Sequence, residues 1–359
     1  MRALVTGGAG FVGSHIVDLL LARGDQVSVL DNLDPRVHGD DDVTLSQEVR
    51  FVRGDLLSPV SLEDALKGGV DLVFHEAAMV GFGRDAVDAE AYVSNNVIGT
   101  IRLMEAIAKL CSRPPRFILA SSMAIYGEGA YECKNCGSSK NIRRNPEDLE
   151  KHNWEPLCPK CGNPLEPRPL TGDHSPAPGN VYAVSKLNQE LLSMTLGRHY
   201  RIPVVALRYH NVYGPRMPRD TPYAGVASIF KSKLLARRPP IIYEDGGQLR
   251  DFIHVEDVAR ANLLAADAPE DTVEFHAFNV GTGQPHQIVE LALQLEKSLG
   301  LDIQPQFPGL FRLGDVRHIF ACTSKIERIG FRPRISFEEG MKRFALEPTR
   351  SPPKVMLSS

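Results

Sequence analysis

The chain alternates short apolar runs with longer stretches in which apolar residues recur every three or four positions. A short apolar run bounded by glycine or polar residues is typical of a buried strand, and the longer period is typical of an amphipathic helix. We therefore expect strands at residues 3–6, 26–30, 49–52, 71–74, 116–120 and 203–207. We expect helices at residues 14–23, 62–67, 92–110 and 182–200.

A glycine-rich turn follows the first of these strands. Gly7, Gly10 and Gly13 are three residues apart and lead into the first helix. Glycine permits a tight turn and lets the backbone approach a pyrophosphate, to which the helix N-terminus offers N–H donors. The second strand ends at Asp31, 18 residues after Gly13. A carboxylate there can accept hydrogen bonds from both ribose hydroxyls of adenosine and would repel a 2′-phosphate, so the pattern favours NAD over NADP.

Repeated strand–helix units predict an α/β fold with a doubly wound parallel sheet of the Rossmann type. Ligands bind such a sheet at the carboxyl ends of its strands. Asp55, Ala77, Ala78 and Ser122 all lie at such ends. We expect an NAD-binding domain at residues 1–210, a smaller α/β substrate domain at 211–347 and a loose tail at 348–359.

Tyr182 and Lys186 are four residues apart in an expected helix, so both side chains leave the same face. An ammonium beside a phenol favours the phenolate and lowers a pKa that starts near about 10, which would make Tyr182 a base near neutrality. Exposed helices often contain such a pair by chance. The glycine turn and Asp31 make the functional interpretation stronger here.

Charge and cysteine content narrow the possible partners. The 359 residues include 41 basic and 44 acidic ones, so we expect no nucleic-acid or membrane partner on electrostatic grounds. No apolar run approaches the roughly 18 residues that span a bilayer, and the N-terminus passes directly into the glycine motif instead of a signal peptide. We therefore expect a cytoplasmic protein. Six cysteines are too few and too unevenly placed for a disulfide scaffold.

Four of the cysteines form two knuckles, Cys133-x-x-Cys136-Gly and Cys158-x-x-Cys161-Gly, with 21 residues between them. This is close to the zinc-ribbon spacing of about 15 to 20, and four thiolates make a closed structural zinc site. A pair of redox-active dithiols and a four-sulfur iron site are the alternatives. The inserted segment, 130–172, has little core of its own, so a metal would supply its folding free energy.

The sequence indicates the function of this insert less clearly than it indicates its metal-binding pattern. Between Cys133 and Thr171 it has seven basic and five acidic residues, and Trp154 is its only obvious stacking aromatic, so nucleic-acid binding has little support. The insert joins the strand that ends at Ser122 to the helix that begins near Tyr182. We therefore hypothesise that it forms a lid beside the substrate site or an oligomer contact.

The order and spacing of several motifs resemble those of the extended short-chain dehydrogenases/reductases, in the NAD-dependent nucleotide-sugar epimerase/dehydratase family typified by UDP-galactose 4-epimerase. The resemblance covers nearly the whole chain apart from the insert and the tail. Its motifs are Gly7-x-x-Gly10-x-x-Gly13, His75-x-Ala77-Ala78, Asn96-Val97-x-Gly99-Thr100, Ser121-Ser122-x-x-x-Tyr126-Gly127, Tyr182-x-x-x-Lys186 and Arg208-Tyr209-His210-Asn211.

The resemblance implies the catalytic residues. Ser122 and Tyr182 would bind the sugar hydroxyl, and Lys186 would bond the nicotinamide ribose and keep Tyr182 acidic. Tyr182 would take a proton from the 4-hydroxyl as hydride moves from C4 to NAD, leaving a 4-keto sugar. Met123 and Ala124 stand where related 4,6-dehydratases have an Asp-Glu pair, and decarboxylating relatives have Glu at the second position. Dehydration and decarboxylation are therefore disfavoured.

The resemblance also implies two sets of binding residues. The cofactor contacts would be Gly7, Gly10, Phe11, Val12, Gly13, Asp31, Asn32, Asp55, Leu56, Ala77, Ala78, Asn96, Tyr182, Lys186 and Tyr209. The substrate contacts would be Ser122, Asn211, Tyr243, Arg250, Arg312 and Arg317. Tyr243 would pack on the nucleobase and the arginines would contact phosphate or ribose. The alternative for each arginine is a surface salt bridge.

We predict an NAD-dependent nucleotide-sugar 4-epimerase with a zinc-ribbon insertion. A nucleotide-sugar dehydrogenase or 4-ketoreductase would use the same residues and is the enzymatic alternative. An NAD-binding sensor or regulator that acts through the zinc ribbon is the alternative of another class. Family habit implies a homodimer formed through the helices expected at 92–110 and 182–200. The nucleotide, the sugar and the stereocentre stay open.

Overall fold

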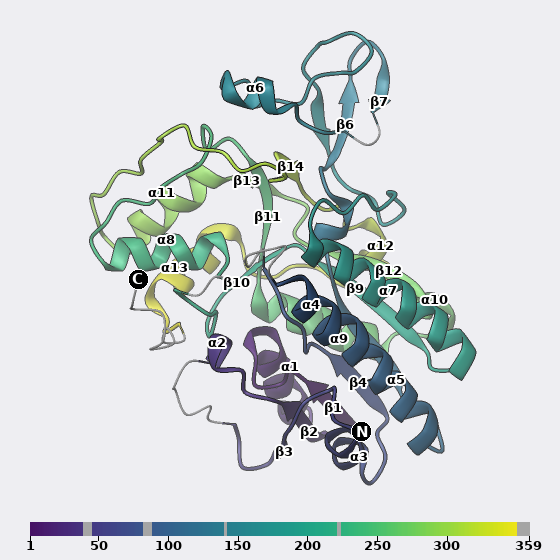
Figure 1. The fold of residues 1–359 in the computed structure, drawn as a ribbon. Helices are drawn as coiled ribbons and strands as arrows, with labels where there is room; N and C mark the ends of the chain where they lie inside the picture. The colour runs from purple at the N-terminus through teal and green to yellow at the C-terminus, as the bar shows by residue number, and fades with distance from the viewer. Residues whose placement is uncertain (39–44, 82–87, 140–141, 221–223, 350–359) are drawn as a thin grey trace.

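The computed structural model describes residues 1–38, 45–81, 88–139, 142–220 and 224–349. Its centre is a seven-stranded parallel sheet with the strand order β12-β9-β5-β4-β1-β2-β3 (Figure 1). The strands are β1 (Arg2–Thr6), β2 (Gln26–Asp31), β3 (Arg50–Arg53), β4 (Leu72–His75), β5 (Arg116–Ser122), β9 (Val204–Tyr209) and β12 (His276–Val280). The prediction of a parallel, doubly wound sheet is confirmed.

Helices cover both faces of this sheet. On one face lie α1 (Phe11–Ala22) and α9 (Val255–Asp267), and on the other lie α3 (Pro59–Leu66), α5 (Gly99–Leu110) and α7 (Val181–Tyr200). Successive residues of β1 alternate between the two cores: Ala3 and Val5 belong to the first, and Leu4 belongs to the second. Because both faces are covered, most of the strands are continuous apolar runs, and the sequence pattern predicted six of the seven. The exception is β12, which begins with a histidine and contains Asn279.

The segment expected as one helix over residues 92–110 is longer and interrupted. It consists of α4 (Ala89–Tyr92), the π-helical segment η1 (Val93–Ile98) and α5. Asn96, in η1, accepts a hydrogen bond from the Met79 N–H at 2.7 Å and donates from Nδ2 to the Met79 carbonyl at 2.9 Å and to Ser185 Oγ at 2.9 Å. The π turn therefore joins the strand end after β4 to α7, and π turns are frequent at functional sites.

A smaller lobe follows the large sheet. It contains a four-stranded sheet of β10 (Asn211–Tyr213), β11 (Leu249–His254), β13 (Pro285–Gln287) and β14 (His318–Ile319), in which β11 pairs with the other three strands. The helices α8 (Val226–Leu235), α11 (Ile288–Ser298) and α13 (Phe337–Leu346) enclose its core. The chain also returns to the large sheet with α9 and β12. The domain division at residue 210 stays a prediction.

The insert is a separate small unit that projects from the body (Figure 1). It contains an antiparallel sheet of β6 (Ala130–Cys133), β7 (Gly137–Ser139) and β8 (Glu166–Arg168), together with α6 (Pro146–Glu150). Near its end, the Leu170 N–H donates to the Phe320 carbonyl at 2.9 Å, and the Cys322 N–H donates to the Leu170 carbonyl at 2.8 Å. The insert is thus attached to the segment around β14.

The remaining helices are short: α2 (Pro35–His38), η2 (Met123–Tyr126), α10 (Glu270–Val273) and α12 (Ser324–Glu327). In the part of the chain that the structure describes, no helix has the length and apolar character needed to cross a membrane. Most of the tail that we expected to be loose, residues 350–359, lies outside the described residues.

Candidate active site

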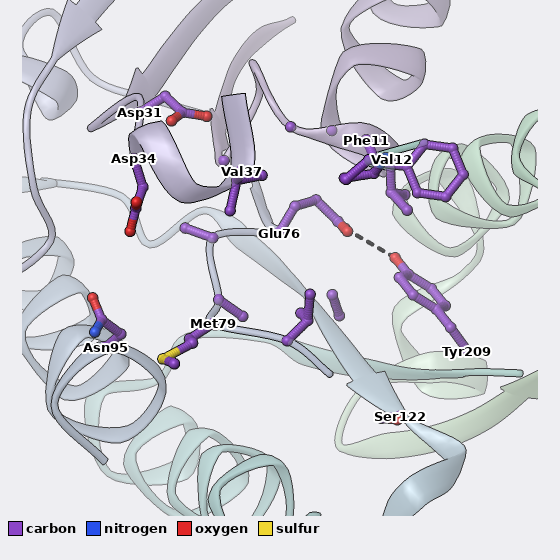
Figure 2. Close-up of a pocket in the computed structure, with 18 of the residues that line it drawn as sticks. Phe11, Val12, Asp31, Asp34, Val37, Glu76, Met79, Asn95, Ser122 and Tyr209 are labelled. Atoms are coloured by element: carbon purple, nitrogen blue, oxygen red, sulfur yellow. Dashed lines mark hydrogen bonds between the residues drawn. The ribbon is translucent and has the colours of Figure 1, made fainter. Parts of the chain in front are cut away.

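A cavity of about 410 Å³ opens at the carboxyl ends of β1, β2, β4, β5 and β9. It is lined by most of the residues that the sequence predicted for the cofactor and the catalytic centre. These are Gly7, Gly10, Phe11, Val12, Gly13, Asp31, Asn32, Asp55, Leu56, Ala77, Ala78, Ser122, Tyr182, Lys186, Tyr209 and Asn211. In Figure 2, Asp31 and Asp34 lie on one side of this pocket and Ser122 and Tyr209 on the other. The cavity is therefore elongated between a β2 end and a β5–β9 end.

The glycine turn is closed so tightly that side chains would not fit. Gly7 has φ +69°, and a Cβ there would lie 2.7 Å from the Ala77 nitrogen. A Cβ on Gly13 would lie 2.3 Å from the Gly7 carbonyl oxygen. Helix α1 begins after Gly10 without a side-chain cap and without an acidic residue in its first turn. Its N–H groups therefore face the cavity as donors suited to a pyrophosphate, so the site fits a dinucleotide.

Asp31 ends β2 with its carboxylate fixed by the backbone. Its Oδ2 accepts from the Ala9 N–H at 3.1 Å, its Oδ1 accepts from the Leu33 N–H at 2.9 Å, and His38 Nε2 lies 3.5 Å from Oδ1. Asn32 Nδ2 donates to Asp55 Oδ2 at 2.9 Å. An acid held in this way at the cavity wall fits the predicted contact with ribose hydroxyls.

Ser122 and Tyr182 meet at the β5–β9 end. Ser122 is the last residue of β5, where its Oγ accepts from the Ala124 N–H at 3.1 Å, and it lies close enough to the Tyr182 side chain to lower the pKa of that phenol. Tyr182 lies in the first turn of α7, which begins at Val181 because Asn180 caps it by accepting from the Ala183 N–H at 2.8 Å. The predicted pair of Ser122 and Tyr182 is thus assembled by a strand end and a helix start.

Lys186 lies one turn after Tyr182, but its ammonium donates to the Ala120 carbonyl and to Gln189 Oε1. Burial lowers the pKa of Lys186 to about 8, although Glu76 and Glu190 oppose this shift. Burial also raises the pKa of Tyr182, and the hydrogen bond with Ser122 offsets only part of the rise. Lys186 is not among the causes of this shift, since its ammonium is directed to Ala120 and Gln189, so the lowering of the Tyr182 pKa that the spacing predicted is not found.

A buried chain of hydrogen bonds supports Lys186 from behind. Gln189, which accepts from Lys186, donates from Nε2 to Thr100 Oγ1 at 2.8 Å. The two ring nitrogens of His75 lie 2.7 Å from Thr100 Oγ1 and 2.7 Å from Thr6 Oγ1. Burial, followed by the charge of Lys186, lowers the pKa of His75 to about 3, so the ring is neutral. This chain connects β1, β4, α5 and α7.

A second buried network fixes α7 to the sheet, and the sequence reasoning did not identify it. Glu190 accepts from Ser121 Oγ at 2.6 Å and from Arg208 Nη2 at 2.6 Å. Arg208 also donates to the Tyr126 hydroxyl at 2.7 Å, and Tyr126 donates to Asn279 Oδ1 at 2.7 Å. Arg208 and Tyr126 both belong to motifs that the family shares. An arginine in a buried strand needs an acidic partner, and this need was the signal that could have indicated Glu190.

Glu76 is another cavity residue that the sequence reasoning missed. It is the variable position in His75-x-Ala77-Ala78, directly after β4, and it lines the cavity. Its Oε1 accepts from the Tyr209 hydroxyl at 2.9 Å (Figure 2). Burial raises the pKa of Glu76 to about 7, against the opposing effect of the hydrogen bond from Tyr209. Its position at a strand end was the signal that could have identified it.

The predicted substrate residues are more dispersed. Asn211 lines the cavity, and its Oδ1 has no hydrogen-bond partner among the described residues. The Arg312 guanidinium lies 4.8 Å from the centre of the Tyr243 ring. Arg250 donates to the backbone carbonyls of Leu249, Val316 and Arg317.

Arg317 is buried among carboxylates. Its guanidinium lies 2.6 Å from Glu155, 2.9 Å from Glu244 and 2.7 Å from Asp245. Five predicted binding residues are absent from the cavity lining. Four of them belong to the smaller lobe and its following segment, namely Tyr243, Arg250, Arg312 and Arg317, and the fifth is Asn96 in η1. Their binding roles stay predictions.

The four knuckle cysteines converge in the insert. The sulfurs of Cys133, Cys136, Cys158 and Cys161 all lie within 4.8 Å of one another. Both knuckles end at glycines with positive φ, +78° at Gly137 and +73° at Gly162. Hydrogen bonding from the Lys160 N–H is the main cause that lowers the pKa of the Cys158 thiol, to about 6. The neighbouring sulfurs raise the pKa of Cys136 and Cys161 in turn, so the four thiols influence one another's ionisation. The convergence of four sulfurs is the feature that suits a tetrahedral metal ion.

Comparison with known proteins gives a consistent result. A family model described as "NAD dependent epimerase/dehydratase family" matches residues 3–152 and 158–281. The dTDP-L-rhamnose 4-epimerase of Burkholderia thailandensis is 33% identical over 352 residues, covering 95% of this chain and 93% of that protein.

Two solved structures also match nearly the full length. A UDP-N-acetylglucosamine 4-epimerase from Methanobrevibacter ruminantium, in complex with UDP-N-acetylmuramic acid, has a TM-score of 0.77 and 30% identity and is matched over 96% of both chains. The UDP-glucose 4-epimerase of Thermus thermophilus, in complex with NAD, has a TM-score of 0.74 and 31% identity over 96% of this chain and 98% of that one.

Proposed function

This chain belongs to the NAD-dependent epimerase/dehydratase family, and we propose that it epimerises a nucleotide-diphosphate sugar at C4 through a transient 4-keto sugar. The observation that supports this most directly is the placement of Ser122 beside Tyr182 at one end of a cavity whose other end has the glycine turn and Asp31. A dinucleotide in this cavity would extend from the adenosine contacts to the reactive pair.

NAD, when bound, supplies a reversible hydride acceptor. Tyr182 accepts the proton of the sugar 4-hydroxyl, and Ser122 holds the same oxygen through its hydroxyl. Lys186 contributes positive charge and a donor beside the cofactor ribose. After the keto sugar has turned over in the site, Tyr182 returns the proton to the new 4-hydroxyl. A cationic nicotinamide would help to offset the burial that raises the pKa of Tyr182.

The two positions that follow Ser122 hold no proton-transfer pair. Met123 and Ala124 begin η2 directly after β5, in the position where related dehydratases have acidic residues. Neither side chain can donate or accept a proton, so elimination of the 6-hydroxyl and loss of a carboxylate lack an acid or base there. Epimerisation at C4 needs only the residues already present.

Incubation with UDP-, dTDP-, GDP- and CDP-sugars, followed by NMR of the products, tests the proposal and identifies the substrate. We expect interconversion of two 4-epimers with no net formation of NADH. Stoichiometric NADH and accumulation of a keto sugar would instead support a dehydrogenase or ketoreductase. Binding of NAD without turnover of any sugar would support a sensor or regulator.

We propose that the cysteine cluster binds one structural zinc ion. Support comes from the convergence of four sulfurs and from the small core of the insert, which consists of Tyr131, Leu165 and the buried cysteines with Ile142. Metal analysis should find about one zinc per chain, and Cys158→Ser should lose it while Cys322→Ser, outside the cluster, keeps it. Iron, or a metal-free protein with reversible disulfides, would support the alternatives.

We propose a homodimer formed through α7 and the α4–η1–α5 segment. Support comes from large apolar side chains that these helices expose, namely Val93, Ile98, Leu110, Val184 and Leu191. Leu191→Glu should convert dimers to monomers in sedimentation, because a carboxylate would be buried in the contact. Val60→Glu, at a more exposed apolar position on α3, should leave the assembly unchanged. The expected cytoplasmic location also stays a proposal, which cell fractionation tests.

We propose that the predicted substrate residues bind the nucleotide. Asn211 has a free acceptor at the cavity, and Tyr243 with Arg312 presents a ring and a cation in the adjoining lobe. Arg250 and Arg317 would support this region through the ion pairs and carbonyl contacts already described. Asn211→Ala and Arg312→Ala should raise KM for the nucleotide sugar more than they lower kcat.

A further inference from the structure

Glu76 is set apart from the other acidic residues of the cavity by its position at the β5–β9 end. Four acidic residues line the described cavity, and Asp31, Asp34 and Asp55 belong to its β2 end. Glu76 instead points toward Tyr209, which is paired in register with Ser122 across β5 and β9 (Figure 2). It is therefore the acid of the reactive end among the described lining residues.

The Tyr209 hydroxyl lies between Asn262, on α9, and Glu76. Asn262 donates to the hydroxyl oxygen from Nδ2 at 2.7 Å, and its Oδ1 is an acceptor at 3.1 Å. Glu76 Oε1 is the nearer acceptor, at 2.9 Å, and a carboxylate accepts more strongly than an amide, so the hydroxyl proton goes to Glu76. Burial and the neighbouring Glu76 hold the pKa of Tyr209 well above its usual value, so Tyr209 remains a donor. Glu76 is thus held as an acceptor at a fixed place in the cavity wall.

The charges that face Glu76 are few. Tyr209 on β9 faces it with a neutral hydroxyl, and Asn262 on α9 is uncharged. Lys186 on α7 is close enough to lower its pKa electrostatically. His75, the preceding residue, is neutral and bonded to Thr6 and Thr100. A carboxylate in this setting is partly balanced by Lys186 and remains able to interact with a further cation.

With NAD bound as proposed, the nicotinamide half would occupy the reactive end, where Glu76 lies, and the two forms of the cofactor differ in charge at that half. The oxidised nicotinamide ring is cationic and the reduced ring is neutral, whereas the adenosine half is identical in both. We propose that Glu76 is a positioning residue of the reactive end whose carboxylate favours the oxidised over the reduced form of the bound cofactor. The inference rests on the proposed function, because it requires NAD in this cavity. It assigns to Glu76 a role in keeping the enzyme ready to accept hydride.

Competition between the two cofactor forms tests this inference. The full-length protein is equilibrated with fixed mixtures of NAD⁺ and NADH, and the bound forms are quantified after rapid filtration. At pH 8.5, Glu76→Gln should lower the preference for NAD⁺ over NADH on the order of tenfold, because it removes one charge at close range. Tyr209→Phe keeps that charge and should retain most of the preference.

Asp34→Asn is the matched control, since it removes a cavity carboxylate at the adenosine end. It should change the binding of both forms equally and leave their ratio unchanged. A ratio in Glu76→Gln within twofold of the unmodified protein would overturn the inference. Failure of the unmodified protein to bind either form would contradict the proposed NAD site instead.

The unmodified protein provides a second test that needs no variant. Its preference for NAD⁺ should increase as pH rises through neutrality, because Glu76 becomes ionised in that range. Loss of the Lys186 proton, with a pKa of about 8, would add a further rise at higher pH that Glu76→Gln retains. Most of the ionisation of Glu76 falls between pH 5.5 and 7.5, because its pKa is about 7. A preference that does not change over this range would contradict the inference.

Discussion

At the scale of single residues, burial controls the charge of the reactive groups. Tyr182, Lys186 and Glu76 share one cavity, and desolvation moves each toward its neutral form. The pKa values of about 7 for Glu76 and about 8 for Lys186 bring both groups close to neutrality. Small changes of charge in the cavity can therefore change their protonation, as is typical of acid–base sites.

Replacement of the proposed base should separate chemistry from binding. Tyr182→Phe should lower kcat by about 10²- to 10⁴-fold, because it removes the group that exchanges the proton with the 4-hydroxyl. Tyr200→Phe changes the same residue type at the far end of α7 and should keep full activity. NMR of the sugar products gives kcat, and absorbance of the purified protein gives the bound cofactor. Full activity in Tyr182→Phe would exclude Tyr182 as the base.

Glu76→Gln should change how stability depends on pH. The folded-state pKa of about 7 is above the usual value near 4.5, so the folded protein binds more protons between these values and loses stability as pH rises through them. The variant lacks this loss, and its unfolding free energy relative to the unmodified protein should rise by a few kcal/mol, to order of magnitude, between pH 4.5 and 8. Denaturant titrations across this range measure the difference. A constant difference would mean that Glu76 keeps an ordinary pKa.

At the scale of elements, α7 is the helix that brings the reactive residues together. Its N-terminus presents Tyr182, its first turns present Lys186, and its middle contains Glu190, which pairs with Arg208 on β9. Gln189 connects it to α5. The cap, the ion pair and the hydrogen-bonded chain together determine where the Tyr182 hydroxyl lies relative to Ser122.

Removal of the cap of α7 should affect both stability and turnover. Asn180→Ala deletes the acceptor for the Ala183 N–H and should cost about 1 kcal/mol of unfolding free energy. Because Tyr182 lies in the first turn, kcat should also fall. Asn180→Asp keeps an acceptor and should retain most of both, as measured by denaturant unfolding and product NMR. Equal behaviour of the two variants would show that the cap is unimportant.

At the scale of the whole molecule, the insert is attached to the smaller lobe by buried charges. Glu244 lies 2.7 Å from Arg144 of the insert and 2.9 Å from Arg317, and all three side chains are buried. Glu155, from the insert, also contacts Arg317 and His318. The segment predicted to bind nucleotide is therefore in direct contact with the insert that contains the four-cysteine cluster.

Breaking this charge cluster should weaken the attachment of the insert. Glu244→Gln leaves Arg144 and Arg317 with fewer partners and should cost about 3 kcal/mol of unfolding free energy, since buried charges lose compensation. KM for the nucleotide sugar should rise while NAD affinity stays unchanged. Glu132→Gln breaks an exposed ion pair with Arg168 within the insert and should have little effect. An unchanged KM in Glu244→Gln would show that the insert and the substrate site are independent.

The sequence alone predicted six of the seven strands of the large sheet and the glycine turn, because these depend on local periodicity and on short motifs with fixed geometry, but it did not predict the strand β12. It also predicted that Asp31, Ser122, Tyr182 and Lys186 belong to one site, and the structure places all four in the wall of one cavity. The sequence did not reveal the π turn at Asn96, since one extra residue in a helical turn leaves the apolar pattern almost unchanged.

Only the tertiary structure decided which distant side chains meet. Glu76 and Tyr209 are 133 positions apart, and Arg317 and Glu155 are 162 apart, so no local pattern brings them together. The pKa of Tyr182 was likewise decided in three dimensions. The spacing places Lys186 one turn away, but its ammonium is directed to Ala120 and Gln189, and the desolvation that raises the pKa of Tyr182 depends on the elements that enclose the ring.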